Sequence, residues 1–195
     1  MINLKTTDGV PFRCYISGEK ITRNAILVLH EWWGLKEHNL DWADRFAKAG
    51  YKSIVVDLYD GRVTDNPKEA SAWMSDLDQT QADAKLLKAI STLKAEGSTV
   101  AIYGCSMGGK QAMRATLLNP EAIKATVVVY SRMETEHSKL KKLRGPVLAI
   151  YAEQESAWPD KQEAFEAAMD AVDGVTESLS LDAAPCVSQG FARRK

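Results

Sequence analysis

The chain has 195 residues, of which 45% are hydrophobic and 26% charged, and its formal net charge is −1 at pH 7. This length and apolar share suit one folded domain with a sizeable core, so we predict a single domain over residues 1–195. Lysine and arginine are scattered rather than clustered, which argues against nucleic acid or an anionic membrane surface as a partner.

Short apolar runs alternate with amphipathic stretches along the chain. Runs typical of strands occur at residues 12–16, 25–29, 53–56, 100–103, 126–130, 147–151 and 176–181. Helices are predicted at residues 41–49, from Asn66 onward, at 82–95, at 108–118, and after Asp160, which we expect to be an N-cap. Strands separated by helices predict an α/β fold, with a mostly parallel central sheet and helices on both faces.

Cysteine usage and the N-terminal sequence indicate a cytoplasmic protein. No apolar run approaches the ~18 residues of a membrane span, and the first residues lack the basic and apolar regions of a signal peptide. Cys14, Cys105 and Cys186 are widely spaced, which favours reduced thiols over a disulfide framework. No residues have metal-ligand spacing, so we predict neither a metal nor another cofactor. No sequence pattern identifies an interface, so a monomer and a homodimer are both open.

The pentapeptide GCSMG at residues 104–108 is the strongest functional motif. A predicted strand precedes it and a predicted helix follows it, which is the context of a nucleophile elbow. In so tight a turn the apex residue, Ser106, is strained, its neighbours must be small, and its hydroxyl is exposed at the end of the sheet. The backbone N–H of Met107, at the start of the helix, is expected to stabilise an oxyanion. Cys105 is interpreted as a packing residue that points away from the pocket.

Several motifs together resemble the dienelactone hydrolase (carboxymethylenebutenolidase-like) family of the α/β-hydrolase superfamily. They are HEWWG at residues 30–34, GY at 50–51, DLY at 57–59, GCSMGG at 104–109, PVLAI at 146–150 and GF at 190–191. The resemblance implies an α/β-hydrolase fold. It also implies hydrolysis of a small-molecule lactone or other carboxylic ester through a covalent acyl-enzyme.

The resemblance further implies roles for individual residues. Ser106 holds the position of the nucleophile, which is often a cysteine in the family. Glu31 matches the family's glutamate near the nucleophile, and Trp32 matches the residue whose N–H completes the oxyanion hole. Glu155 matches the acid that orients the catalytic histidine, at a position where the family usually has Asp. Either carboxylate can accept a hydrogen bond from an imidazole, and a solvated side chain is the alternative for Glu155.

The main departure from the family lies near the C-terminus. The family motif His-Gly-Phe reads QGF here, so Gln189 stands at the position of the catalytic histidine. Gln has no titratable group and cannot take a proton from a serine hydroxyl. Relatives also continue into a closing helix after this motif, so we expect the end of this fold to be diverged or truncated and to lack that helix. Two functions therefore stay open: a slow serine hydrolase, or a catalytically impaired or inactive α/β-hydrolase-fold protein that binds a small ligand or a partner.

Other residues have both a functional and a structural interpretation. His30 follows a predicted strand and is expected to be structural, although it could act as a base. His38 is expected to be solvated or to cap a helix, and His137 to lie in an exposed loop. Arg62 could bind a substrate carboxylate or be a surface residue. Three aromatic residues could line an apolar pocket or pack beneath its loops: Trp32, Trp33 and Trp158.

Overall fold

The computed structural model describes residues 1–18, 22–155 and 157–184 of the chain. This part forms one sheet of eight strands in the order β1-β2-β4-β3-β5-β6-β7-β8. The strands are β1 (Ile2–Lys5), β2 (Pro11–Ser17), β3 (Asn24–Leu29), β4 (Lys52–Val56), β5 (Thr99–Cys105), β6 (Ile123–Val129), β7 (Val147–Ala152) and β8 (Thr176–Leu181). β2 runs antiparallel to β1 and to β4, and all other neighbouring strands are parallel.

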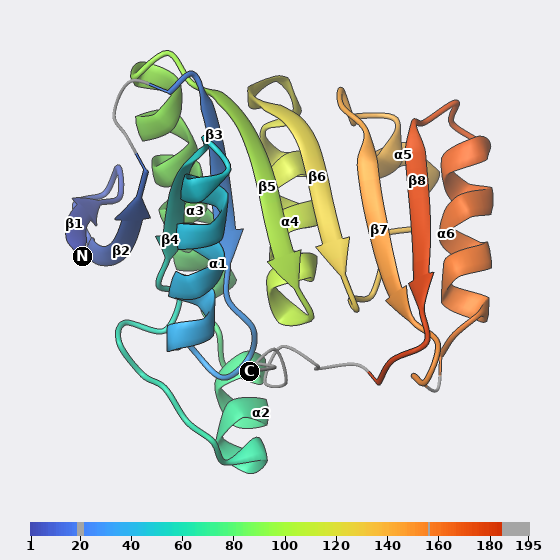
Figure 1. The fold of residues 1–195 in the computed structure, drawn as a ribbon, viewed down its shortest axis with the longest axis horizontal. Helices are drawn as coiled ribbons and strands as arrows, with labels where there is room; N and C mark the ends of the chain where they lie inside the picture. The colour runs from blue at the N-terminus through green and yellow to red at the C-terminus, as the bar shows by residue number, and fades with distance from the viewer. Residues whose placement is uncertain (19–21, 156, 185–195) are drawn as a thin grey trace.

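Helices connect most of the strands and cover both faces of the sheet (Figure 1). They are α1 (Glu37–Lys48), α2 (Pro67–Ser75), α3 (Gln79–Ala95), α4 (Met107–Leu118), the 3₁₀ turn η1 (Pro120–Ala122), α5 (His137–Leu140) and α6 (Asp160–Asp170). The α/β architecture predicted from the alternating pattern is therefore confirmed. In the described part of the chain, no helix has both the length and the apolar character that crossing a bilayer demands.

Three clusters of apolar side chains form the core. On one face, Ala43 of α1 packs with Val28 and Val55 of the sheet. On the opposite face, α3 and α4 pack through residues such as Leu86 and Ala112, and α5 and α6 continue this layer over β7. Figure 1 shows α1 in front of the sheet and α3 and α4 behind it. This division follows from right-handed crossovers. The chain passes from β3 to β4 toward one edge of the sheet, whereas it passes from β5 through β6 and β7 to β8 toward the opposite edge.

None of the described elements covers one face of the sheet at the edge that ends in β8. Ile150 of β7 and Leu179 of β8 are paired residues on the face opposite the cluster formed with α6. Leu179 and Leu181 are 44% and 45% exposed, so the described elements leave this apolar surface in contact with solvent. The expected divergence at the C-terminal end concerns residues 185–195, which lie outside the described part of the chain.

Several element boundaries differ from the prediction, and each difference has a local cause. Helix α1 begins at Glu37, four residues before the predicted start, because the Lys36 N–H donates to Asn39 Oδ1 over 2.9 Å in the first turn. Helix α3 begins at Gln79, because the Asp78 side chain accepts from two first-turn amides. The prediction that Asp160 is an N-cap is wrong: Pro159 holds that position. Strand β1 and helix α5 were not predicted, since both are only four residues long.

Candidate active site

Ser106 sits at the abrupt turn between β5 and α4. Its backbone has φ 53° and ψ −119°, a conformation that L-residues rarely adopt and that costs of order 1–3 kcal/mol. The neighbouring strand holds the turn, because the Ser106 N–H donates to the carbonyl of Val129 at 2.8 Å. The side chain is partly exposed, and among the described residues it takes part in no hydrogen bond. The strained strand–turn–helix predicted from the GCSMG motif is present.

Three glycines let α4 approach the sheet at this turn. A Cβ atom at Gly104 would overlap the carbonyl of Gly108, and one at Gly108 would lie 2.7 Å from the carbonyl oxygen of His30. A Cβ atom at Gly109 would lie 2.7 Å from the Cβ of Ser131. Side chains are thus excluded at all three positions, which is the reason that the elbow requires glycine. The same contacts place the first turn of α4 directly against the end of β3.

His30 is fully buried at the end of β3, and both of its ring nitrogens are engaged by backbone groups. Nε2 lies 3.0 Å from the amide nitrogen of Leu58, which donates to it, and Nδ1 lies 2.7 Å from the carbonyl oxygen of Glu31. The ring is therefore held as the neutral tautomer with its proton on Nδ1. Burial lowers the pKa of His30, against smaller opposing effects of the Glu31 carbonyl and of nearby carboxylates. His30 has the structural role expected for it.

The buried imidazole predicts a pH dependence of stability. An unfolded histidine takes up a proton near pH 6.5, whereas the lowered pKa keeps His30 neutral in the folded chain. The unfolded state therefore binds more protons than the folded state below pH 6.5. As the pH is lowered through this range, the free energy of unfolding should fall by up to about 1.4 kcal/mol per pH unit. Urea unfolding at pH 7.5, 6.5 and 5.5 measures this slope. The slope should be smaller in His30→Gln, and equal slopes in the wild type and His30→Gln would contradict the assignment.

A tight turn at residues 31–34 follows β3 and carries the predicted oxyanion amide of Trp32. The Gly34 N–H donates to the Glu31 carbonyl at 3.3 Å, and the Trp32 and Trp33 rings pack edge-to-face with centroids 4.9 Å apart. Gly34 has φ +87°, and a Cβ atom there would overlap the backbone of Arg62. The loop after β4 therefore clamps this turn. Trp32 packs against the core cluster that contains Met107, so the structure brings these two predicted residues to the same part of the sheet.

Glu31 and His38 form a hydrogen-bonded pair beside this turn. His38 Nε2 lies 3.0 Å from Glu31 Oε2, and the Glu31 carboxylate is only 4% exposed. His38 belongs to the first turn of α1, so the early start of that helix is what brings the imidazole to the carboxylate. The expectation that His38 is solvated or caps the helix is wrong, since its side chain is 21% exposed and bonded to Glu31. Sequence reasoning missed this pair, because residues seven apart across a loop have no diagnostic spacing.

The loop after β4 packs against the start of α4. Tyr59 is fully buried, and its hydroxyl lies 3.0 Å from the sulfur of Met107. Asp57, also fully buried, accepts hydrogen bonds from the Tyr59 N–H at 3.0 Å and from the Arg13 guanidinium at 2.8 Å. The DLY motif at residues 57–59 is thus a structural support of the elbow. The sequence identified the motif by resemblance but did not reveal this contact.

Arg62 is exposed at the edge of the same loop. Its Nε donates to the carbonyl of Tyr59 at 3.2 Å, and its guanidinium lies 4.9 Å from the centroid of the Trp73 ring. Among the described residues it forms no ion pair. Its terminal N–H groups are therefore free of protein carboxylates in this part of the chain.

Glu155 and Trp158 lie across the sheet from β5, the strand that leads to Ser106. Both follow β7, which is two strands away from β5, or about 10 Å. Glu155 forms an ion pair with Lys161 of α6, and Trp158 Nε1 donates to Gln162 Oε1 at 2.9 Å. Trp158 packs against the core cluster of α5 and α6, whereas Trp32 packs against that of α3 and α4. The described contacts therefore do not join Trp158 to the two tryptophans of the oxyanion turn.

Cys105 and Gln189 are two other residues to which the sequence assigned a role. Cys105 is buried and hydrogen-bonds with Tyr103, in keeping with a packing role. Cys14 and Cys105 are both free and buried. Gln189, at the position of the family's histidine, lies outside the described residues.

Known proteins resemble this chain along most of its length. The model of the dienelactone hydrolase family matches residues 12–193. Protein usf of Aquifex pyrophilus is 29% identical over 158 residues, covering 76% of this chain and 68% of that protein. A dienelactone hydrolase-like promiscuous phosphotriesterase from metagenomic libraries superposes with a TM-score of 0.77 at 18% identity, over 92% of this chain and 80% of its own.

The dienelactone hydrolase of Anabaena variabilis superposes with a TM-score of 0.71 at 18% identity, over 92% of this chain and 83% of its own. These structural likenesses confirm the predicted α/β-hydrolase fold. The family model matches nearly the whole chain, and this match establishes the family to which the chain belongs. The chain belongs to the dienelactone hydrolase family, a family of hydrolases.

Proposed function

We propose that this chain hydrolyses small carboxylic esters or lactones through an acyl-enzyme on Ser106. The Ser106 Oγ attacks the carbonyl carbon, its proton passes to a solvent water, and the carbonyl oxygen becomes an oxyanion between the amides of Met107 and Trp32. Collapse of this intermediate breaks the bond to the leaving oxygen, which takes a proton from water and either departs as the alcohol or opens the lactone, and an ester is left on Ser106. Water then adds to the acyl carbon and releases the carboxylate, which regenerates the serine hydroxyl.

The backbone of Ser106 is the observation that supports this proposal most directly. A buried serine in an ordinary turn would have no reason to adopt φ 53° between a strand and a helix. The fold holds this conformation with three close glycine contacts and leaves the hydroxyl without a hydrogen-bond partner among the described residues. Such a hydroxyl is available to a substrate.

Other residues around the turn would contribute to binding. The exposed Arg62 guanidinium suits a carboxylate on the substrate, and Trp33 presents an aromatic surface at the oxyanion turn. Glu155 would act as the acid of the triad through Oε2, because Oε1 is the oxygen that pairs with Lys161. Trp158 would border the site from the β7 side. We place the whole reaction at the carboxyl ends of β3, β5 and β7, where ligands gather in such sheets.

A non-catalytic binding protein is the second candidate function. Gln189 favours it, because glutamine at the position of the family's histidine cannot accept the proton of Ser106. Such a protein would bind an ester or lactone beside the elbow without turning it over.

Hydrolysis of p-nitrophenyl acetate separates the two functions. We compare the wild type with Ser106→Ala and with Ser91→Ala, the same change at an exposed serine of α3 whose hydroxyl donates to the Lys88 carbonyl. The hydrolase proposal predicts that Ser106→Ala loses the protein-dependent rate and that Ser91→Ala keeps it. A wild-type rate equal to that of Ser106→Ala would support the binding protein instead.

His38 is expected to position Glu31 beside the elbow, and its substitution tests that role. Removal of the imidazole in His38→Ala takes away the 3.0 Å hydrogen bond to the buried Glu31 carboxylate, so the carboxylate is oriented less firmly. We expect kcat for p-nitrophenyl acetate to fall about 10-fold with little change in KM. His38→Gln, which keeps an N–H donor near the same place, should restore most of the rate. Equal losses in both variants would instead indicate a general disturbance of α1, which thermal unfolding would also report.

A further inference from the structure

The Arg62 side chain lies in the corner between two aromatic rings. Its guanidinium is 4.9 Å from the centroid of the Trp73 ring and 5.7 Å from that of the Tyr59 ring. The planes of the two rings meet at 80°, and their centroids are 5.9 Å apart. Aromatic rings attract a guanidinium at such distances. Two rings at nearly a right angle therefore restrict the guanidinium in two directions at once.

A hydrogen bond restricts the rotation of the same guanidinium. Arg62 Nε donates to the carbonyl of Tyr59 at 3.2 Å. The two terminal nitrogens remain, and their parallel N–H groups form the fork that binds a carboxylate through two hydrogen bonds. Among the described residues, Arg62 forms no ion pair. A guanidinium that is already held in place loses little freedom when it binds a carboxylate from solution.

The corner is fixed relative to the elbow. Tyr59 is fully buried, and its hydroxyl lies 3.0 Å from the sulfur of Met107. On the other side of Arg62, the Thr64 N–H donates to the carbonyl of Trp33 at 3.1 Å. Residues 59–64 are thus attached both to the start of α4 and to the oxyanion turn. These contacts hold the Arg62 side chain at the edge of the proposed site.

Trp73 comes from α2, a helix that is buried through few of its side chains. Ala70 is fully buried and Trp73 is half-buried, whereas the other seven residues of α2 are exposed. Residues three apart lie on the same side of a helix, so Ala70 and Trp73 form the inward side of α2. Figure 1 shows α2 beyond the carboxyl ends of the strands, at the end of the sheet where β5 leads into α4. The contact with Tyr59 and Arg62 is therefore a main attachment of this helix.

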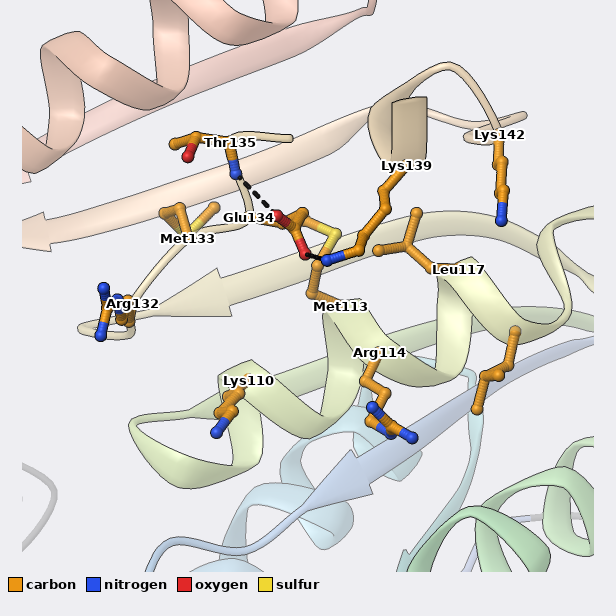
Figure 2. A pocket seen from close by; sticks show the side chains of 11 residues that line it. Lys110, Met113, Arg114, Leu117, Arg132, Met133, Glu134, Thr135, Lys139 and Lys142 are labelled. Carbon is orange, nitrogen blue, oxygen red and sulfur yellow. Dashed lines mark hydrogen bonds and ion pairs between the residues drawn. The ribbon is translucent and has the colours of Figure 1, made fainter. Parts of the chain in front are cut away.

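The basic side chains along α4 are arranged differently. Arg132 and Lys142 line opposite ends of a groove there (Figure 2). The ion pair of Glu134 and Lys139 lies between them, so the two outer cations do not converge on one anion. Arg62 needs no second cation, because its own fork offers two N–H groups to one carboxylate.

We infer that Trp73 is a positioning residue: its ring holds the Arg62 guanidinium, and this makes the site select esters that carry a carboxylate over neutral esters of the same size. The inference rests on the proposed function, in which esters bind beside Arg62. Without the ring, the guanidinium has to be ordered at the moment of binding. This ordering weakens the binding of an anionic ester about fivefold.

Calorimetric titration of Ser106→Ala measures this selectivity without turnover. Monomethyl adipate has a carboxylate where methyl hexanoate has a methyl group, so the ratio of their dissociation constants reports the preference for the anion. We expect a preference of about 10-fold for monomethyl adipate. Adding Trp73→Leu, which keeps the apolar bulk, should reduce this ratio about fivefold. Adding Trp73→Phe instead should preserve most of it, because an aromatic face remains.

Arg62→Gln separates an effect through Arg62 from a general disturbance of α2. In that background the preference should be lost, and adding Trp73→Leu should change the ratio no further. Met74→Leu, at an exposed neighbour on α2, should leave the ratio within about twofold of its starting value. A ratio that Trp73→Leu leaves unchanged, or that it lowers equally without Arg62, would overturn the inference.

Turnover of the corresponding 4-nitrophenyl esters distinguishes this inference from the proposed function. With Ser106 intact, Trp73→Leu should raise KM for mono-4-nitrophenyl adipate about fivefold and change kcat little. If neither this ester nor 4-nitrophenyl hexanoate is hydrolysed while the binding ratios behave as expected, the proposed hydrolysis fails and the role of Trp73 stands. If both esters are hydrolysed with no effect of Trp73→Leu on their relative KM, the role of Trp73 alone is wrong.

Discussion

Gln189→His is expected to raise the rate of p-nitrophenyl acetate hydrolysis by about 100-fold or more. General acid–base catalysis by a positioned side chain contributes roughly 10²- to 10⁴-fold, and glutamine supplies none of it. Restoring an imidazole at the position that the family uses for its base would let Ser106 lose its proton during attack. The same imidazole would return that proton to the leaving group.

Two companion variants make this gain interpretable. Ser106→Ala combined with Gln189→His should show no gain, because the added histidine acts only through the serine hydroxyl. Gln189→Asn should behave as the wild type, since it changes the side chain without adding a base. A Gln189→His protein that folds normally and has the wild-type rate would show that residue 189 does not reach Ser106, and the proposed triad would be wrong.

Gly108→Ala is expected to destabilise the folded chain strongly, because it adds a methyl group where the elbow has no room for one. Alanine is normally favoured over glycine in a helix by about 1 kcal/mol. Here the new Cβ would overlap the carbonyl of Leu29 and lie 2.7 Å from that of His30, so backbone has to move. We expect a loss of about 3 kcal/mol in the free energy of unfolding, measured with urea. Esterase activity should fall as well, since α4 would withdraw from the oxyanion turn.

Gly50→Ala is the matched control for this substitution. A Cβ atom at Gly50 meets nothing within 4 Å, but the residue has φ +91°, so alanine there costs about 1 kcal/mol from backbone strain alone. The difference between the two variants measures the close contact between α4 and the end of β3. A Gly108→Ala protein as stable as Gly50→Ala would contradict the described packing of the elbow.

The sequence predicted the sheet and the elbow because both depend on local patterns. Continuous apolar runs stand at residues 25–29 and 54–56, as expected for strands buried on both faces. The turn at Ser106 needs glycines at fixed positions, so the five consecutive residues of the GCSMG motif predict its geometry. The structural role of His30 could also be anticipated, since a histidine that ends a buried strand has backbone groups within reach.

The rest of the site depends on contacts between distant segments. The pair between Glu31 and His38 exists because α1 begins early, a boundary set by the polar residue Asn39 and not by an apolar pattern. The separation of Trp158 from Trp32 depends on the strand order, which the sequence does not display.

Labelling with a fluorophosphonate tests most directly whether Ser106 is a nucleophile. The reagent forms a stable bond to an activated serine, and mass spectrometry of the digested protein identifies the modified peptide. We predict one adduct per chain, on Ser106, that is absent in Ser106→Ala and that forms faster in Gln189→His. A wild-type protein that stays unlabelled, or that carries the same adduct after Ser106→Ala, would contradict the claim.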